Sequence, residues 1–326
     1  MASQPTLVVE ELRTHFHTKA GVVKAVDGVS FKVERGDVLG LVGESGSGKS
    51  VTGFSILGLV DPPGQIVGGR IAFQGRDIHG LPDDDLRALR GGKIAMVFQD
   101  PMMTLNPVLR IDTQMIEAVL AHQDVGRSAA RERARAALTK VGIASPDERL
   151  AAYPHQFSGG MRQRVAIAIA MLNEPELIIA DEPTTALDVT IQAQILFEVQ
   201  NLCRDTGTSL LWITHDLTVV AGLADRLCVM YAGRDVEQGS VDEVLDAPRH
   251  PYTRGLIGSV PSRNRRGVAL YQIPGMAPAP LELPAGCAFS PRCDRATGAC
   301  GQTPPLAYLG DERSARCHHP YQGPGG

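Results

Sequence analysis

The sequence has little that would mark a membrane-spanning, secreted or nucleic-acid-binding protein. Among its 326 residues, no apolar run approaches the roughly 20 residues needed to cross a bilayer. The stretch Met1–Thr6 has neither a basic region nor an apolar core, so we expect no secretion signal. Basic side chains number 32 against 36 acidic ones, and the net charge of −4 gives no overall positive field for nucleic acid. These absences favour a globular protein that could still dock onto a membrane partner.

Cysteine is absent before Cys203, and the six cysteines of the chain are unevenly placed. Cys203 and Cys228 lie in apolar surroundings. The other four crowd into the last part of the chain and are Cys287, Cys293, Cys300 and Cys317. Without a secretion signal we expect a reducing compartment, which argues against disulfides and in favour of a metal site.

The most informative stretch is Gly43–Ser50, which fits the pattern G-x-x-x-x-G-K-[ST] and follows the apolar run Val38–Val42. Its glycines let successive backbone N–H groups point at phosphate oxygens, while Lys49 can reach the β- and γ-phosphates and Ser50 can serve Mg²⁺. The helix expected to begin near Lys49 adds its positive end. The preceding strand and the Lys-Ser ending favour a phosphate-binding loop over a flexible glycine turn.

Three other strand-like apolar runs end in polar side chains. Ile94–Phe98 is followed by Gln99, Leu177–Ala180 by Asp181 and Glu182, and Leu210–Thr214 by His215. In a chain with a phosphate loop, Asp181 stands where a Mg²⁺-coordinating acid is needed, and Glu182 can activate or position a water in line with the γ-phosphate. A solvated strand end and a structural histidine are the alternatives. Parallel sheets, however, place their ligands at this edge.

Two helical stretches lie between these strand ends. The first, from Thr113 to about Val141, contains the Arg- and Ala-rich piece Arg127–Leu138, which we interpret as a solvated face rather than a nucleic-acid contact. The second follows Phe157–Arg164, whose Ser-Gly-Gly centre is either an anion-ready helix N-terminus or an ordinary helix entry.

In this order and spacing, these motifs resemble the nucleotide-binding subunit of an ABC transporter, over roughly residues 6 to 260. The resemblance implies an α/β fold of the P-loop NTPase class, with a RecA-like core, an antiparallel β layer and a helical subdomain at about residues 101–172. The nucleotide-binding domain is expected to span residues 1–260 and to be followed by a small, irregular, cysteine-rich extension at residues 261–326.

The resemblance also assigns roles to individual residues. The Walker A loop and its successor contact the nucleotide through Gly43, Glu44, Ser45, Gly46, Ser47, Gly48, Lys49, Ser50 and Val51. The signature consists of Ser158, Gly159 and Gly160, with Phe157 and Met161 replacing the usual Leu and Gln at its ends. Asp188 of the segment Leu187–Asp188 lies in the D-loop. The expected catalytic residues are Glu182, His215 as the switch histidine, and Lys49.

Two ligand contacts complete this prediction. Mg²⁺ is expected to be held by Ser50, Gln99 and the Walker B aspartate Asp181, with Gln99 also sensing the membrane partner. Phe16 could stack on the adenine base of ATP, or it could be an ordinary core residue.

Finer features point to the dipeptide and oligopeptide importer ATPases. The loop Gly43–Ser50, the segments Phe157–Arg164 and Asp181–Thr190, and His250–Leu256 at the expected start of the C-terminal extension all resemble that subfamily. Nickel importers share much of the pattern, so both peptides and nickel stay open as the transported solute.

This resemblance implies a membrane-peripheral machine on the cytoplasmic face. Two ATPase subunits, expected to be paralogues in a heterodimer, meet head to tail, so that Ser158–Gly160 of one caps ATP on the Gly43–Ser50 loop of the other. Closure of the pair drives two transmembrane permease subunits, which an external substrate-binding protein supplies.

Beyond Pro261 the composition shifts to Pro, Gly and Arg, with too few apolar residues for a separate core. Four thiolates at Cys287, Cys293, Cys300 and Cys317 are enough for tetrahedral Zn²⁺ or for a [4Fe–4S] cluster. Because no C-x-x-C pair occurs, the wide spacing favours the cluster, with zinc and plain thiols as alternatives. The resemblance also favours an iron–sulfur cluster.

Two other classes of ATPase fit the sequence less well. A soluble ABC ATPase of DNA repair would carry a long coiled coil between Ser50 and Asp181, and one of translation would usually carry two cassettes in one chain. A P-loop kinase would leave Ser158–Gly160 and His215 without a role. The transporter ATPase is therefore the favoured prediction.

Overall fold

The computed structural model describes residues 4–184, 189–261, 264, 267, 269, 271–310 and 312–322. They divide into two compact units. The first contains the described residues up to Thr6, together with Glu34–Gly36 and Gly80–Leu211. The second contains Leu7–Val33, Asp37–His79 and the described residues from Trp212 onward.

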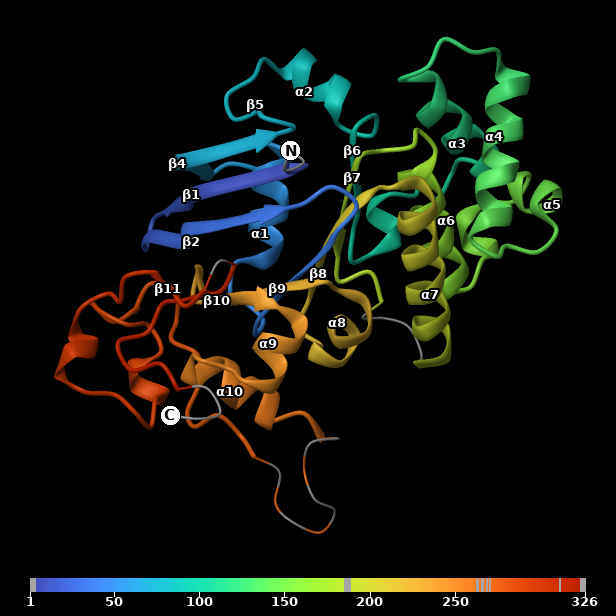
Figure 1. Ribbon diagram of the computed structural model, residues 1–326. Coiled ribbons are helices and arrows are strands. Elements are labelled where there is room, and N and C mark those ends of the chain that lie inside the picture. Colours follow the sequence, from blue (N-terminus) through green and yellow to red (C-terminus); the bar gives the residue numbers. More distant parts are fainter. Residues whose placement is uncertain are drawn as a thin grey trace. The chain divides into compact units, whose positions relative to one another are not determined.

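An antiparallel layer forms one part of the second unit. Its strands β1 (Leu7–Thr18), β2 (Gly21–Val33), β4 (Gly64–Phe73) and β5 (Arg76–Asp77) are ordered β2-β1-β4-β5. Apolar residues near the start of β1 are buried in alternation, as expected for a sheet with one face on a core. β1 is one long strand, interrupted by register shifts between Val9 and His15. Figure 1 shows β1, β2 and β4 side by side.

The phosphate loop follows β3 (Val38–Val42), all five residues of which are buried. β3 pairs in parallel with β9 (Arg226–Tyr231), and β9 pairs antiparallel with β10 (Arg234–Ser240). The apolar run of β3 agrees with a strand covered on both faces. The unit also contains the helices α1 (Lys49–Ile56), α8 (Leu217–Leu223), α9 (Val241–Asp246) and α10 (Pro251–Gly258).

The C-terminal extension joins this unit through short elements. They are the 3-10 turns η4 (Ser290–Arg292) and η5 (Gly298–Gly301) and the strands β11 (Ala307–Tyr308) and β12 (Ser314–Ala315). β12 pairs antiparallel with β10, with Ala315 opposite Glu237. The extension therefore packs against the β9–β10 sheet of the unit that holds the phosphate loop, although it has few apolar residues of its own.

The first unit contains the parallel pair β6 (Ile94–Val97) and β7 (Leu177–Asp181) and most of the helices. Its helical elements are α2 (Asp83–Leu89), η1 (Pro101–Met103), α3 (Ile111–Leu120), α4 (Arg127–Lys140), α5 (Pro146–Leu150), η2 (Pro154–Gln156), α6 (Gly159–Met171) and α7 (Val189–Thr206). The strand β8 (Ser209–Thr214) begins in this unit and ends in the second.

The helical stretch expected from Thr113 to about Val141 consists of two helices, α3 and α4, separated by the segment 121–126. Gly126 precedes α4 in an extended conformation, which ends helical continuity. Ala130, Ala134 and Leu138 of α4 are fully buried at four-residue spacing, whereas Arg131 and Arg133 are exposed and Arg135 is half-buried. This pattern agrees with the interpretation of the segment as a helix with one solvated face.

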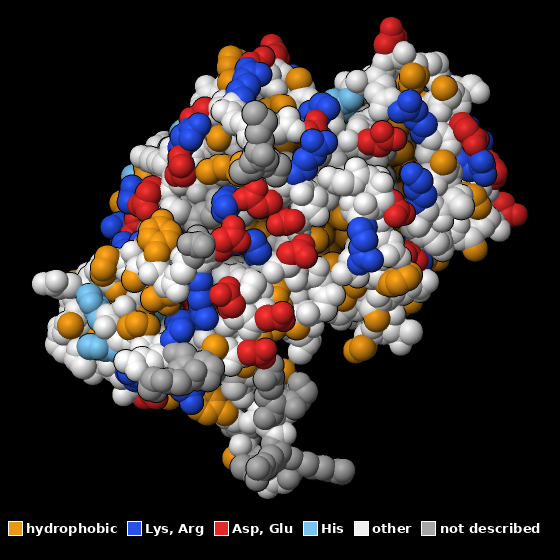
Figure 2. All heavy atoms as spheres, in the orientation of Figure 1, with side chains coloured by type: hydrophobic (Ala, Val, Ile, Leu, Met, Phe, Trp, Pro, Cys, Tyr) orange, Lys and Arg blue, Asp and Glu red, His pale blue; other side chains and the backbone are white. Residues whose placement is uncertain are grey.

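The surface agrees with the weak net charge. Figure 2 shows Lys and Arg side chains interspersed with Asp and Glu over the visible face. Among the described residues, no helix combines the length and the apolar character that a membrane crossing requires.

Candidate functional site

Lys49 lies at the centre of the phosphate loop, where β3 passes into α1. The residue is 4% exposed, and its Nζ donates to the carbonyl oxygens of Gly43 at 2.9 Å and Glu44 at 3.0 Å. A third contact reaches Ser47 Oγ at 3.5 Å. The predicted cation therefore sits inside the curl of the loop, where phosphate oxygens are expected.

The glycines at the two ends of the loop are sterically required. A Cβ on Gly48, whose φ is +100°, would lie 2.2 Å from the carbonyl oxygen of Ala25. A Cβ on Gly43 would lie 2.2 Å from the carbonyl oxygen of Met230. Backbone that comes this close on both sides, together with a buried lysine, fits a loop that cradles phosphate.

Gln99, Asp181 and Glu182 lie at one end of a parallel strand pair in the first unit. β6 and β7 are in register with Val97 opposite Ala180, so Gln99 and Glu182, each two positions later, follow the strands at the same edge. Gln99 Nε2 donates to Glu182 Oε2 at 3.4 Å, and Asp181 is 4% exposed. Glu182 has a φ of +44°, a conformation that a non-glycine residue rarely adopts. Such backbone is concentrated at functional sites.

The signature segment is exposed, whereas the phosphate loop is closely packed. Ser158 and Gly159 are exposed, and Ser158 Oγ caps α6 by accepting from the N–H of Met161 at 3.3 Å. No described heavy atom lies within 4 Å of a Cβ built on Gly159. Ser158–Met161 and Gly142–Ala144 border a groove of about 620 Å³ in the first unit.

One buried side chain fixes the helix behind the signature. Arg164 of α6 is 7% exposed, and its Nη1 donates to the Val141 carbonyl at 3.0 Å and to Glu198 Oε1 at 3.3 Å. Burial raises the pKa of the Glu198 carboxyl, and the Arg164 charge opposes that rise. Arg164 therefore ties α6 to the end of α4 and to α7.

Three other predicted residues have separate positions. His215 is exposed directly after β8, and Asp216 beside it caps α8 by accepting from the N–H of Thr218 at 2.8 Å. Phe16 is half-buried on β1, between Val23 and Gly64 on the neighbouring strands. Asp188 lies outside the described residues. The expected Mg²⁺ ligands are divided between the units, since Ser50 belongs to the second and Gln99 and Asp181 to the first.

The four cysteines of the extension line one small pocket of about 10 Å³, together with His250, His318 and His319. All six cysteines of the chain are free thiols. Burial raises the pKa of the extension thiols Cys287 and Cys293, and that of Cys317 to about 11. Within the described residues, however, no group of three or more His, Cys, Asp or Glu side chains is placed to hold a metal ion.

The structure therefore does not support the predicted [4Fe–4S] or Zn²⁺ site at Cys287, Cys293, Cys300 and Cys317 in this arrangement. The four thiols line one pocket, but a metal ion also needs several of them at ligand distance at the same time.

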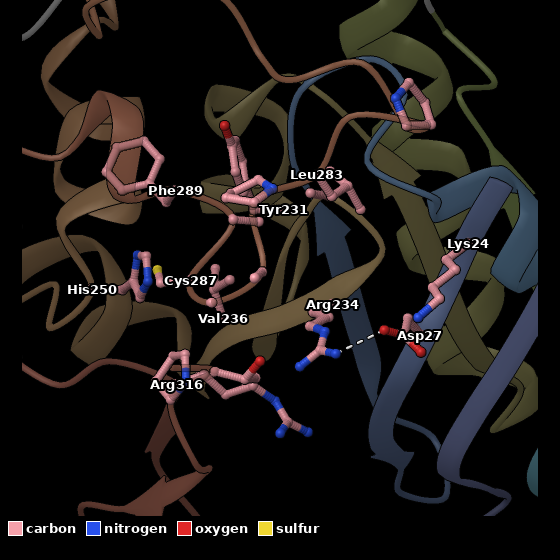
Figure 3. Close-up of a pocket in the computed structure, with 18 of the residues that line it drawn as sticks. Lys24, Asp27, Tyr231, Arg234, Val236, His250, Leu283, Cys287, Phe289 and Arg316 are labelled. Carbon is pink, nitrogen blue, oxygen red and sulfur yellow. Dashed lines mark hydrogen bonds and ion pairs between the residues drawn. The ribbon is translucent and has the colours of Figure 1, made fainter. Parts of the chain in front are cut away.

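A larger cavity of about 300 Å³ lies beside the cysteine pocket in the second unit (Figure 3). Arg234 and Asp27 form an ion pair at 2.7 Å in its wall. The two cavities share His250, Cys287 and Phe289. His250 is 2% exposed, and burial lowers its pKa to about 3, so it is neutral near pH 7.

Two residues that hold the phosphate loop were missed from the sequence. The N–H of Glu44 donates to the hydroxyl of Tyr252 at 2.8 Å, and Arg292 donates to the Glu44 carboxylate at 2.8 and 3.2 Å. Tyr252 lies in the recognised segment His250–Leu256, but no local pattern marks Arg292.

Comparisons with known proteins agree with these motifs. Residues 26–185 match the family model "ABC transporter", and residues 236–300 match "Oligopeptide/dipeptide transporter, C-terminal region". The oligopeptide transport ATP-binding protein OppD of Escherichia coli is 46% identical over 97% of this chain and 94% of its own length. The dipeptide transport ATP-binding protein DppD of Bacillus subtilis is 48% identical over 96% of this chain and 94% of its own.

Two solved structures share the fold. One is a dimeric post-hydrolysis state of the ATP-binding cassette MJ0796, bound to ADP and phosphate. The match covers 72% of this chain and 98% of the MJ0796 chain, with 26% identity and a TM-score of 0.66. The other is CbiO1 of Clostridium perfringens, part of an ABC transporter complex. The match covers 75% of this chain and 92% of the CbiO1 chain, with 28% identity and a TM-score of 0.64. The predicted α/β nucleotide-binding fold is therefore confirmed.

Proposed function

Since this chain belongs to the ATP-binding subunits of the dipeptide and oligopeptide ABC importers, we propose that Lys49, Glu182 and His215 carry out the ATP hydrolysis that powers peptide import. The observation that carries this assignment is the closed phosphate loop, with Lys49 buried among its own carbonyl oxygens. The family assignment also makes the protein an ABC transporter ATPase.

The loop binds the triphosphate through the backbone N–H groups of residues 43–50 and through Lys49. Ser50, Gln99 and Asp181 would hold Mg²⁺, which would supply positive charge to the β- and γ-phosphates. Hydroxyl, amide and carboxylate oxygens suit this hard cation. Gln99 also lies within hydrogen-bonding distance of Glu182, which supports a shared role at the reacting end of ATP.

Glu182 accepts a proton from the attacking water or orients that water. Its left-handed backbone and its position directly after the buried Asp181 support this role. His215 steadies the γ-phosphate, Asp188 belongs to the D-loop, and Phe16 stacks on adenine. The half-buried position of Phe16 leaves part of its side chain accessible.

The remaining half of each site comes from a second ATPase subunit. The exposed Ser158 and Gly159 support this proposal, and the cassette MJ0796 has been solved as a dimer. The partner is a paralogue, and the pair sits on the cytoplasmic face of the membrane against two permease subunits supplied by an external binding protein. Residues 1–260 act as the ATPase domain and residues 261–326 as its extension.

Peptides are favoured over nickel as the cargo, because the relatives OppD and DppD are named for oligopeptide and dipeptide transport. Co-purification with two membrane proteins is the expected result for the transporter. Recovery on ribosomes or DNA instead would favour a soluble ABC ATPase.

The cysteine pocket carries a second proposal. Four thiols that line one pocket suit a [4Fe–4S] cluster, provided that they move closer than they are in this structure. Protein purified without oxygen should then be brown, with broad absorbance near about 400 nm and stoichiometric iron and sulfide. A colourless preparation with stoichiometric zinc would favour Zn²⁺, and one without metal would leave plain thiols.

The catalytic assignment is tested with Glu182→Gln in the assembled transporter. Turnover should fall at least about 100-fold, because the general base is lost, while ATP binding persists and the ATPase pair stays closed. Glu176→Gln makes the same change just before β7, at the end of the strand opposite Glu182, and should hydrolyse ATP normally. Normal hydrolysis by Glu182→Gln would remove Glu182 from the catalytic role.

A further inference from the structure

Glu44, the second residue of the phosphate loop, is held at its N–H, its carbonyl and its side chain. Its N–H donates to Tyr252 Oη at 2.8 Å, and its carbonyl accepts from Lys49 Nζ at 3.0 Å. Its carboxylate accepts two bonds from Arg292, Nη1 to Oε2 at 2.8 Å and Nη2 to Oε1 at 3.2 Å. Paired N–H donors on one carboxylate fix orientation as well as distance.

Arg292 is built into the C-terminal extension, one residue before Cys293. Its side chain is 7% exposed, and that of Glu44 is 28% exposed. Nε donates to the Pro274 carbonyl at 2.9 Å, and Nη1 also donates to Tyr231 Oη at 3.3 Å. All three guanidinium nitrogens of Arg292 therefore have acceptors, and the segments around Pro274 and Arg292 are tied to the loop.

An aromatic cluster surrounds this ion pair. The rings of Tyr231 and Tyr252 are 4.6 Å apart, and each lies within 5.5 Å of the Phe289 ring. The Arg292 guanidinium carbon lies 5.8 Å from the centre of Tyr231 and 5.9 Å from that of Phe289. Figure 3 shows Tyr231, Phe289 and His250 on neighbouring walls of the large cavity. The rings beside Arg292 lower the local dielectric on that side of the pair, which strengthens its attraction to Glu44.

The charge of Glu44 makes this pair relevant to ATP. A carboxylate in a loop that receives a triphosphate repels that anion unless a cation neutralises it. Lys49 cannot fully neutralise both the Glu44 carboxylate and the triphosphate, since it is the residue expected to reach the β- and γ-phosphates. Arg292 supplies that cation, since a guanidinium stays protonated in proteins.

We propose that Arg292 is a positioning residue for ATP: it neutralises Glu44 and holds the phosphate loop in its binding shape, so that the C-terminal extension helps to set nucleotide affinity. Arg292 acts through Glu44 and does not touch the nucleotide. The inference rests on the assignment of Gly43–Ser50 as the ATP-binding loop.

The test measures the Kd of the full-length chain for fluorescent mant-ATP with Mg²⁺, and kcat at saturating ATP in the assembled transporter. Arg292→Met should raise Kd about tenfold, because it leaves the Glu44 carboxylate unpaired beside the phosphates. The value of kcat should change less than about twofold. Arg292→Lys keeps the charge but loses the paired bonds, so its Kd should rise only about threefold.

The double variant Arg292→Met/Glu44→Gln separates charge from folding. Removing the unpaired carboxylate should return Kd to within about threefold of that of the unaltered chain. If Arg292 served folding alone, the double variant would bind as weakly as Arg292→Met or more weakly, and the proposal would be overturned. A urea unfolding curve of each variant identifies any that is not folded, in which case Arg292→Lys decides.

Two further variants provide controls. Arg316→Met breaks another ion pair of the extension, with Asp235, whose side chains are 12% and 0% exposed, and should leave the Kd for mant-ATP unchanged. Lys49→Ala should weaken binding strongly, because it removes the loop cation. Normal binding by Arg292→Met beside weak binding by Lys49→Ala overturns the role of Arg292 alone, whereas normal binding by Lys49→Ala overturns the loop assignment itself.

Discussion

The phosphate loop and the signature segment use glycine for opposite reasons. In the loop, a Cβ on Gly43 or Gly48 would overlap backbone of the same chain at 2.2 Å. At Gly159 of the signature, no described atom comes within 4 Å of the added Cβ. The loop is thus shaped by its own fold, whereas nothing in the described chain requires glycine at the signature. The difference agrees with a signature that is completed by another subunit.

The largest effect is expected from Gly48→Ala. The new methyl group meets the Ala25 carbonyl and forces alanine to a φ of +100°, so the unfolding free energy should fall by about 3 kcal/mol. ATP affinity should fall at least about 100-fold, because the loop must open. Mant-ATP binding and urea unfolding measure the two effects.

Gly46→Ala is the matched control within the loop. Gly46 also has a positive φ, +79°, but no described atom lies within 4 Å of its Cβ. The cost should therefore be about 1 kcal/mol, from backbone strain alone. Equal losses for Gly46→Ala and Gly48→Ala would contradict the steric explanation.

Arg164→Met tests how strongly Arg164 anchors α6, the helix that begins in the signature segment. Loss of this guanidinium leaves the Val141 carbonyl and the Glu198 carboxylate without their donor, and should lower the unfolding free energy by about 3 kcal/mol. Arg135→Met removes an exposed pair with Glu132 and should leave the urea midpoint unchanged. Equal urea midpoints for the two variants would show that Arg164 does not anchor α6.

Gly159→Ala should separate turnover from stability. Alanine fits the space and favours the helix, so the unfolding free energy should rise by about 0.5 kcal/mol. In the assembled transporter, kcat should nevertheless fall about tenfold. The added methyl group would keep the phosphate of the ATP bound by the other subunit away from the N-terminus of α6. Unchanged kcat would contradict a phosphate contact at Gly159.

A modest loss of stability is expected at the helix cap. Ser158→Ala removes the acceptor for the N–H of Met161 and should cost about 1 kcal/mol of unfolding free energy. Ser158→Asp supplies another cap acceptor and should restore most of this loss, while its negative charge should impair turnover. Urea unfolding and ATPase assays on both variants measure the two roles separately.

Local patterns predicted much of the fold and of the candidate site. The runs Val38–Val42 and Leu177–Ala180 predicted buried strands, which the structure confirms, and the polar residues that follow them stay predicted site positions. Gly43–Ser50 was recognisable because its spacing itself encodes the backbone shape. The helical stretch from Thr113 to about Val141 was predicted, but its division into α3 and α4 was not, because a helical pattern does not show where packing of two shorter helices interrupts it.

The sequence by itself determined the family, the strand ends and the phosphate loop, since each depends on residues that are close together in the chain. Only the tertiary structure decided what holds that loop, because Glu44 meets Tyr252 and Arg292 across 208 and 248 positions of sequence. It also decided that the four extension thiols share a pocket without forming a metal-binding group. Contacts at such separation leave no periodic trace in the sequence, since they arise only when distant strands and turns pack together.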